Sequence, residues 1–148
     1  WSRYESLIKD DASVLSSIDS YKVAYANPRL APYGKAALEV LEALSLFESL
    51  ERNLVQGENI SQVYQFVFTG NAELGFVAQS QIPHNSELVL GSTWVIPAAL
   101  HSPIKQDVVL LSRAKDNVAA REFMSFLSSP RSQAVIRSYG YESGVSAR

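Results

Sequence analysis

The fold is decided by the stretch Asn27-Pro28-Arg29-Leu30-Ala31-Pro32-Tyr33-Gly34-Lys35-Ala36-Ala37. The apolar segment before it, Val23-Ala24-Tyr25-Ala26, is typical of a buried strand, and the residues after it predict a helix over 34–44. The N–H groups of the first helical turn, and the positive end of the helix dipole, would then point beyond the carboxyl end of the strand. This geometry suits an anion bound by backbone amides. The alternative, more common for a single junction of this kind, is an ordinary connection that binds nothing.

A second junction of the same kind lies between residues 54 and 70. A brief strand, Leu54-Val55-Gln56, precedes Gly57-Glu58-Asn59, in which Asn59 is a favourable N-cap. Apolar residues then recur at helical spacing until Gly70, namely Ile60, Val63, Tyr64, Val67 and Phe68. Helix capping alone explains this pattern locally. If the two strands are parallel neighbours, both helix starts lie at one sheet edge, where ligands of open α/β sheets bind.

Several other short segments follow these two junctions along the chain. They are Gly70-Asn71-Ala72-Glu73-Leu74-Gly75-Phe76-Val77-Ala78, Gly91-Ser92 with Trp94 and Pro97, Pro103-Ile104-Lys105-Gln106-Asp107, and Ser129-Pro130 with Tyr139-Gly140-Tyr141. Together with Ala26-Asn27-Pro28, Ala31-Pro32-Tyr33-Gly34 and Gly57-Glu58-Asn59-Ile60-Ser61-Gln62, they resemble the periplasmic molybdate-binding proteins of ABC importers, which are type II periplasmic binding proteins. The resemblance covers nearly the whole chain. The opening lobe of that family has no counterpart here, so the chain looks like a fragment.

The resemblance implies a site for a tetrahedral oxyanion, molybdate or tungstate, with a sulfate-type anion as the alternative. The matching contacts are the backbone amides of Tyr33 and Ile60, and Gly34 and Ser61 follow them. Some relatives add a tyrosine hydroxyl, but this chain has Ala78 at the matching position. No cofactor is implied, and molybdenum would enter only as its oxyanion, without a directly bound metal. A site of N–H and O–H donors fits a full dianion and disfavours a protonated phosphate, whose own O–H would find no acceptor.

The resemblance also implies a location and a partner. We expect an exported, periplasmic protein that passes its ligand to the membrane permease of an ABC importer. Residues 1–111 would form the second lobe, and residues 112–148 would form C-terminal helices that pack on the first lobe. No signal peptide is visible before Trp1, which we interpret as the start of a mature, truncated or cleaved product.

The complete protein is expected to be a monomer, whereas this chain is expected to self-associate. Without the first lobe, the apolar faces of the last two helices would lack a covering partner. These faces are predicted around Phe123, Phe126, Leu127 and Ile136.

Composition excludes several other classes. The 148 residues carry a net charge of −2, so nothing suggests binding to nucleic acid. No apolar run approaches the ~20 residues that span a bilayer. The chain has no cysteine, which excludes disulfides and thiol chemistry.

The alternation of strand and helix patterns predicts an α/β lobe with a largely parallel sheet flanked by helices. Strands are predicted at residues 21–26, 54–56, 73–78 and 108–111, with a further candidate at 87–90 and 93–95. The segment 108–111 is apolar throughout, which favours a strand with neighbours on both sides. Besides the helices of the two junctions, helices are predicted at 11–17, after the cap Asn117, and from Ser129-Pro130 to Gly140.

No catalytic motif is present in the sequence, and we predict that the chain is not an enzyme. His84 and His101 lack the spacing of a metal pair, and Glu39 and Glu42 are interpreted as a solvated pair on a polar helix face. The charged residues at the helix start, Arg29 and Lys35, are likewise interpreted as solvated rather than as ligands. The aromatic residues assigned to the core are Tyr64, Phe66, Phe68, Phe123 and Phe126.

Two other functions stay open. The first is the ligand-sensing domain of a transcription regulator with the same fold, which would need a helix-turn-helix that this chain lacks. The second is an enzyme on an α/β scaffold, against which only the missing nucleophile–base pair argues.

Overall fold

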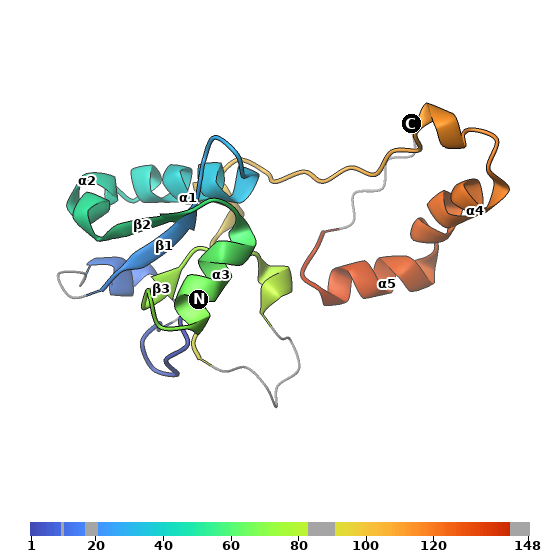
Figure 1. Ribbon diagram of the computed structural model, residues 1–148. Helices are drawn as coiled ribbons and strands as arrows, with labels where there is room; N and C mark the ends of the chain where they lie inside the picture. Colours follow the sequence, from blue (N-terminus) through green and yellow to red (C-terminus); the bar gives the residue numbers. More distant parts are fainter. Residues whose placement is uncertain (10, 17–20, 83–90, 143–148) are drawn as a thin grey trace. The chain divides into compact units, whose positions relative to one another are not determined.

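Figure 1 shows the computed structural model of the chain, which describes residues 1–9, 11–16, 21–82 and 91–142. The chain forms two compact units, Trp1–Ile104 and Lys105–Arg148. This boundary lies ahead of the predicted one at residue 111. Within the described residues, none of the helices has the length and apolar character needed to cross a bilayer.

Three parallel strands form the sheet of the first unit, in the order β2-β1-β3. The central strand β1 (Val23–Ala26) pairs with β2 (Leu54–Gly57) on one side and with β3 (Leu74–Gly75) on the other. The parallel pairing and the flanking helices confirm the predicted fold class. The third strand is shorter than the predicted 73–78, although the Phe76 N–H still donates to the Ala24 carbonyl at 2.9 Å.

The N-terminal residues extend this sheet. The Trp1 amino group donates to the Gly75 carbonyl at 3.0 Å, and the Gly75 N–H donates to the Trp1 carbonyl at 2.9 Å. Ser2 is fully buried and forms an antiparallel bridge with Ser92. The chain start and the residues around position 92 are therefore tied to the sheet through backbone hydrogen bonds.

The sheet is flanked by α1 (Pro32–Ala43) and α3 (Ile60–Phe68). Successive side chains of a strand point to opposite faces, and β1 follows this rule. Val23 belongs to the buried cluster that contains Val40 of α1, and Ala24 belongs to the cluster that contains Val63 of α3. The two helices consequently cover opposite faces of the sheet (Figure 1).

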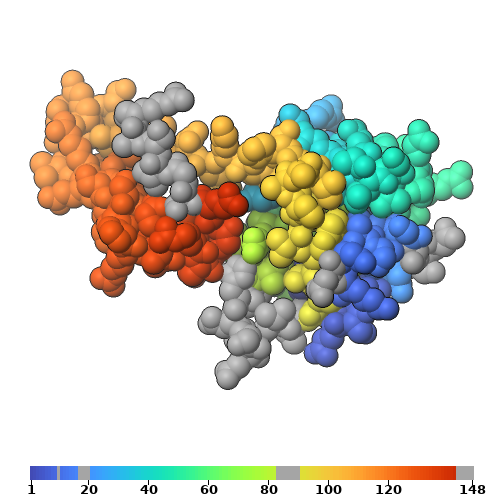
Figure 2. All heavy atoms as spheres, turned by 180° about the vertical axis from the view of Figure 1, so that it is seen from behind, coloured from blue at the N-terminus to red at the C-terminus, as the bar shows by residue number. Residues whose placement is uncertain are grey.

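Shorter elements complete the first unit. They are α2 (Phe47–Leu50) and the 3-10 helices Ala12–Ser16, Glu51–Asn53, Gln79–Gln81 and Ala98–Leu100. The segment over residues 91–104, yellow in Figure 2, lies beside the N-terminal residues and α1. Its partly buried side chains Trp94, Ile96 and Leu100 pack against the same cluster as α1.

The second unit contains a 3-10 helix, Ser112–Ala114, and two α-helices, α4 (Val118–Leu127) and α5 (Pro130–Ser138). The predicted caps are confirmed. Asn117 accepts a hydrogen bond from the Ala120 N–H at 3.1 Å, and Ser129 accepts one from the Ser132 N–H at 3.3 Å. Pro130 takes the first position of α5, and Gly140 follows its end with φ of 80°.

The predicted strand at 108–111 is wrong. Val108, Val109, Leu110 and Leu111 are irregular and exposed, and Val109 is 72% exposed. A strand needs neighbours for its backbone hydrogen bonds, and the described residues provide none beside this segment. Residues 93–95 also form no strand. The candidate strand at 87–90 lies outside the described residues.

The assignment of the aromatic residues to the core is also wrong in part. Phe68, Phe123 and Phe126 are at least half exposed. Phe68 is the last residue of α3. The Tyr64 ring stacks on the Phe68 ring, with centroids 5.9 Å apart, and on the Trp1 ring, with centroids 4.8 Å apart. In the described part of the second unit only Ser132 is buried, so no core covers Phe123 and Phe126.

Candidate functional site

The carboxyl ends of β1 and β2 lie side by side. The two strands are paired so that Ala26 of β1 faces Gly57 of β2. The Asn27 N–H donates to the Gly57 carbonyl at 2.7 Å and extends the pairing beyond the last residue of β1. After each of these strands, the chain leaves the sheet at this edge and then begins a helix. The predicted helix starts near Tyr33 and Ile60, at one sheet edge, are thereby confirmed.

Asn27 organises the turn that leads from β1 to α1. Its buried side chain accepts a hydrogen bond from the Arg29 N–H at 3.0 Å. Its carbonyl accepts hydrogen bonds from the N–H groups of Leu30 at 3.1 Å and Ala31 at 2.9 Å. An asparagine that bonds to its own backbone two residues later is a common turn device. This side chain therefore fixes the direction in which α1 begins.

The start of α1 has no side-chain cap. Ala31 occupies the N-cap position with an extended backbone, and Pro32 occupies the first helical position. Proline has no N–H, and the Gly34 N–H donates to the Ala31 carbonyl at 2.9 Å. Tyr33 lies between Pro32 and Gly34, has a backbone N–H, and is half-buried. Gly34 is thus buried at the start of α1, as a candidate site residue next to Tyr33. Its own amide, however, already has an acceptor within the turn.

Gly34 allows α1 to begin very close to the end of β1. A Cβ atom at this position would clash with the Ala26 carbonyl oxygen and would lie 2.9 Å from the Asn27 carbonyl carbon. Both contacts are with backbone atoms, which cannot move aside as a flexible side chain can. The first turn of α1 is therefore held against the strand end only because residue 34 has no side chain.

The start of α3 is capped by Asn59, whose side chain accepts a hydrogen bond from the Gln62 N–H at 2.9 Å. The Gln62 side chain in turn accepts one from the Glu58 N–H at 2.6 Å. In the part of the chain that the structure describes, the amides of Ile60 and Ser61 donate to no protein acceptor. Ile60 is half-buried and Ser61 is exposed. The first two amides of α3 are consequently available to a ligand.

Gln81 supports the start of α3 and was not predicted from the sequence. Its side-chain oxygen accepts a hydrogen bond from the Ala78 N–H at 3.0 Å, and its nitrogen lies 3.4 Å from the Ile60 carbonyl oxygen. Ala78 itself is buried. A glutamine in a short 3-10 helix gives no sequence signal that it contacts a residue so distant in the chain.

The charged residues near the α1 start differ in their surroundings. Arg29 is exposed, and Lys35 is 70% exposed in its side chain, in agreement with their predicted solvation. Glu39 is not a simple solvated carboxylate. It lies 3.6 Å from the Lys35 ammonium and accepts two hydrogen bonds from Ser102. These bonds, chiefly the one from the Ser102 backbone N–H, lower the pKa of Glu39.

Other parts of the described chain carry no comparable site. No group of three His, Asp or Glu residues that could hold a metal ion occurs in the described ranges. His101 contacts the Ser102 carbonyl through Nδ1 at 2.9 Å, and His84 lies outside the described residues. A shallow depression of about 560 Å³ is lined by Tyr4, Tyr21 and Glu73 among others. It lies near the amino ends of β1 and β3, away from the helix starts.

Three comparisons relate this geometry to known proteins. Residues 4–142 match the family of bacterial extracellular solute-binding proteins. The chain is 45% identical over 141 residues to the molybdate-binding protein ModA of Azotobacter vinelandii, and equally to that of Rhodobacter capsulatus. Both matches cover 95% of this chain, and they cover 56% and 54% of the relatives. The resemblance predicted from the sequence is confirmed.

A solved structure shows the same fold. The periplasmic molybdate-binding protein of Azotobacter vinelandii matches with a TM-score of 0.88 at 32% identity, over 97% of this chain and 63% of its own. These relatives bear the names of binding proteins, in agreement with the prediction that the chain is not an enzyme. The chain spans about half the length of the curated relatives it matches.

Proposed function

The chain belongs to the family of bacterial extracellular solute-binding proteins, and from this membership we propose that it supplies one lobe of the substrate-binding component of a molybdate ABC importer. The names of the relatives from Azotobacter vinelandii and Rhodobacter capsulatus support molybdate as the solute. In this proposal the protein acts in the periplasm, carries no cofactor and delivers its ligand to a membrane permease. Tungstate, which has the same shape and charge, is a second ligand of the same site.

The observation that carries the proposal is the placement of two helix starts behind neighbouring parallel strand ends. Each start carries a partial positive charge, and at the α3 start the amides of Ile60 and Ser61 donate to no protein acceptor among the described residues. A helix N-terminus stabilises an anion by about 0.3–2 kcal/mol, depending on burial. Two of them at one sheet edge attract a dianion without a lysine or arginine ligand, in keeping with the exposure of Arg29 and Lys35.

We assign the contacts to the backbone amides of Tyr33 and Ile60. Each belongs to the first turn of its helix, and the Ile60 amide has no acceptor among the described residues. Ser61 adds its amide or hydroxyl group. Gly34 acts differently, since its own N–H bonds to Ala31 and its lack of a side chain brings the α1 start close to the strand end.

Donor chemistry then accounts for selectivity. A fully deprotonated tetrahedral dianion accepts hydrogen bonds at every oxygen, and the backbone amides assigned to the site can only donate. Monohydrogen phosphate carries one O–H that needs an acceptor, and a site without one leaves this group unsatisfied. Molybdate and tungstate should therefore bind in preference to phosphate.

Titration calorimetry on a two-lobed protein tests this function. The protein is made by joining the chain to the part of the Azotobacter vinelandii relative that the chain does not match. We expect saturable binding of molybdate and tungstate, and much weaker binding of phosphate. A folded two-lobed protein that binds phosphate as tightly as molybdate, or binds none of these anions, would contradict the proposal.

A further inference from the structure

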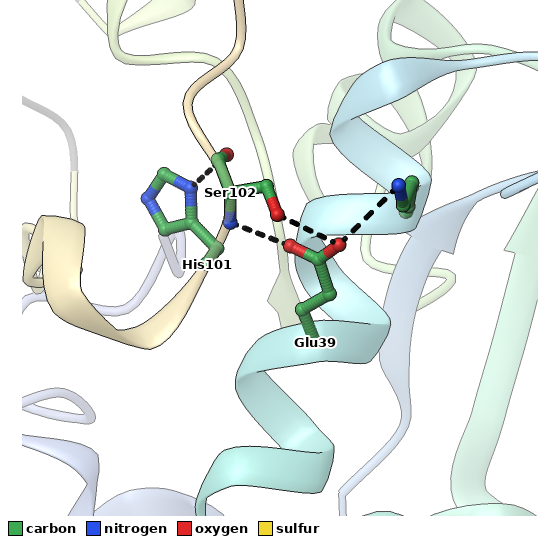
Figure 3. A network of polar contacts seen from close by, with 4 residues as sticks. Glu39, His101 and Ser102 are labelled. Carbon is green, nitrogen blue, oxygen red and sulfur yellow. Dashed lines mark hydrogen bonds and ion pairs between the residues drawn. The ribbon is translucent and has the colours of Figure 1, made fainter.

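Glu39 links α1 to the last segment of the first unit. The Ser102 N–H donates to Glu39 Oε2 at 2.6 Å, and the Ser102 hydroxyl donates to Glu39 Oε1 at 3.2 Å (Figure 3). The Lys35 ammonium lies 3.6 Å from the same Oε1. Three donors thus converge on one carboxylate, whose side chain is only 25% exposed. Lys35 and Glu39 are one helical turn apart, whereas Ser102 lies far away in the sequence.

The place of this contact in the chain is informative. Before Ser102, the 3-10 helix Ala98–Leu100 contacts α1, and Leu100 packs against the buried cluster of the first unit. After Ser102, Pro103 has no N–H, and the first unit ends at Ile104. The next residues, up to 111, have no regular structure. The hydrogen bonds to Glu39 therefore hold this segment to α1 just before the boundary between the units.

We propose that Glu39 is a positioning residue, which holds the main chain at Ser102 against α1 and thereby fixes the point at which the chain leaves the first unit. A bond to the backbone N–H positions the main chain itself, which a contact between two exposed side chains does not do. The lowered pKa of Glu39, caused mainly by this backbone bond, agrees with the contact. The inference is independent of the bound solute.

Hydrogen exchange tests the local contact in the 148-residue chain without any ligand. Glu39→Ala removes the acceptor and keeps a residue with high helix propensity, so α1 should stay intact. We expect the Ser102 amide to exchange at least about threefold faster in this variant, because a lost bond to a charged acceptor exposes the N–H. Glu39→Gln keeps one neutral acceptor and should give a smaller increase. Glu42→Ala, at an exposed position of the same helix, is the matched control and should leave the rate unchanged.

Distances between spin labels test the positioning role. Because the chain has no cysteine, labels can be attached at Gln65→Cys in α3 and Ser125→Cys in α4 without a background signal. Glu39→Ala should broaden the distribution of distances between the units, and Glu42→Ala should leave it as in the parent chain. If Glu39→Ala changes neither the Ser102 exchange rate nor this distribution, Glu39 has no positioning role. Because no solute is present, this outcome would leave the proposed function untouched.

Discussion

The N–H of Asn27 donates to the carbonyl of Gly57 across the ends of two parallel strands, at a distance of 2.7 Å. This bond joins the last paired positions before the chain turns into α1 on one side and into α3 on the other. It fixes the two helix starts relative to the same sheet edge. The proposed oxyanion site depends on this arrangement, because backbone amides can share a ligand only if both are held in place.

The close approach of α1 to the strand end predicts an unusual response to Gly34→Ala. In an ordinary helix, glycine-to-alanine stabilises by about 1 kcal/mol. Here the added Cβ would clash with the Ala26 carbonyl group, so we expect a loss of about 1–3 kcal/mol in the free energy of unfolding. Urea denaturation measures it. Gly57→Ala is the control, since the nearest atom to its Cβ would be in the Val63 side chain at 3.3 Å, and the substitution should cost less. A Gly34→Ala variant more stable than the parent would contradict the predicted clash.

Proline at position 60 separates recognition by the backbone from recognition by the side chain. Ile60 is the first residue of α3, where proline is tolerated, and Asn59 has the extended backbone that a following proline requires. In a two-lobed protein, Ile60→Pro should fold but bind molybdate more weakly by about 1.5–3 kcal/mol, the worth of a hydrogen bond to a charged group. Calorimetry compares it with Ile60→Val, which keeps the amide and should bind almost normally. Unchanged affinity in the proline variant would exclude this amide as a ligand.

Helix starts could be predicted from the sequence because their causes are local. Asn59, Asn117 and Ser129 each accept a hydrogen bond from the N–H three residues later, so the cap and its partner lie in the same short stretch. The shared edge of the two helix starts also followed from the junctions, since parallel strands joined by helices place their carboxyl ends together. These features predicted the two helix starts to which the proposed site is assigned.

The errors concern features that depend on distant residues. The apolar segment 108–111 has the composition of a strand, but a strand forms only where a neighbouring chain completes its hydrogen bonds. Glu39 looks solvated on a helical wheel, and only the fold brings Ser102 to it. Gln81 reaches the start of α3 in the same way. Long-range partners of this kind leave no periodic pattern in a single sequence.

The buried amino group of Trp1 predicts a pH dependence of stability for the 148-residue chain. Burial lowers the pKa of this group from 8.0 to about 6. Between these values the unfolded chain binds the proton and the folded chain largely does not, so the free energy of unfolding should rise by about 2 kcal/mol from pH 6 to pH 8. Denaturation across this range measures the change. Acetylation of the amino group removes the charge but keeps an N–H for Gly75, and should flatten this rise. An equal slope in the acetylated chain would assign it to other groups.

The exposed apolar side chains of the second unit predict self-association. Val118 is 67% exposed, and Phe123 and Phe126 are at least half exposed. Patches of this kind are usually covered by a partner. We expect the 148-residue chain to dimerise or aggregate in sedimentation velocity, and Phe123→Glu together with Phe126→Glu to reduce the association. If the parent chain sediments as a monodisperse monomer at high concentration, these exposed apolar side chains do not cause self-association.

In the proposed site, an oxyanion binds to backbone amides at the starts of α1 and α3. The most direct measurement is an amide NMR titration of the two-lobed protein with molybdate. We expect the N–H resonances of Tyr33 and Ile60 to shift most among the residues of this chain, and both to saturate at the same molybdate concentration as the calorimetric signal. If molybdate binds and the largest shifts lie elsewhere in this chain, with the resonances of both amides unchanged, these amides are not the ligands.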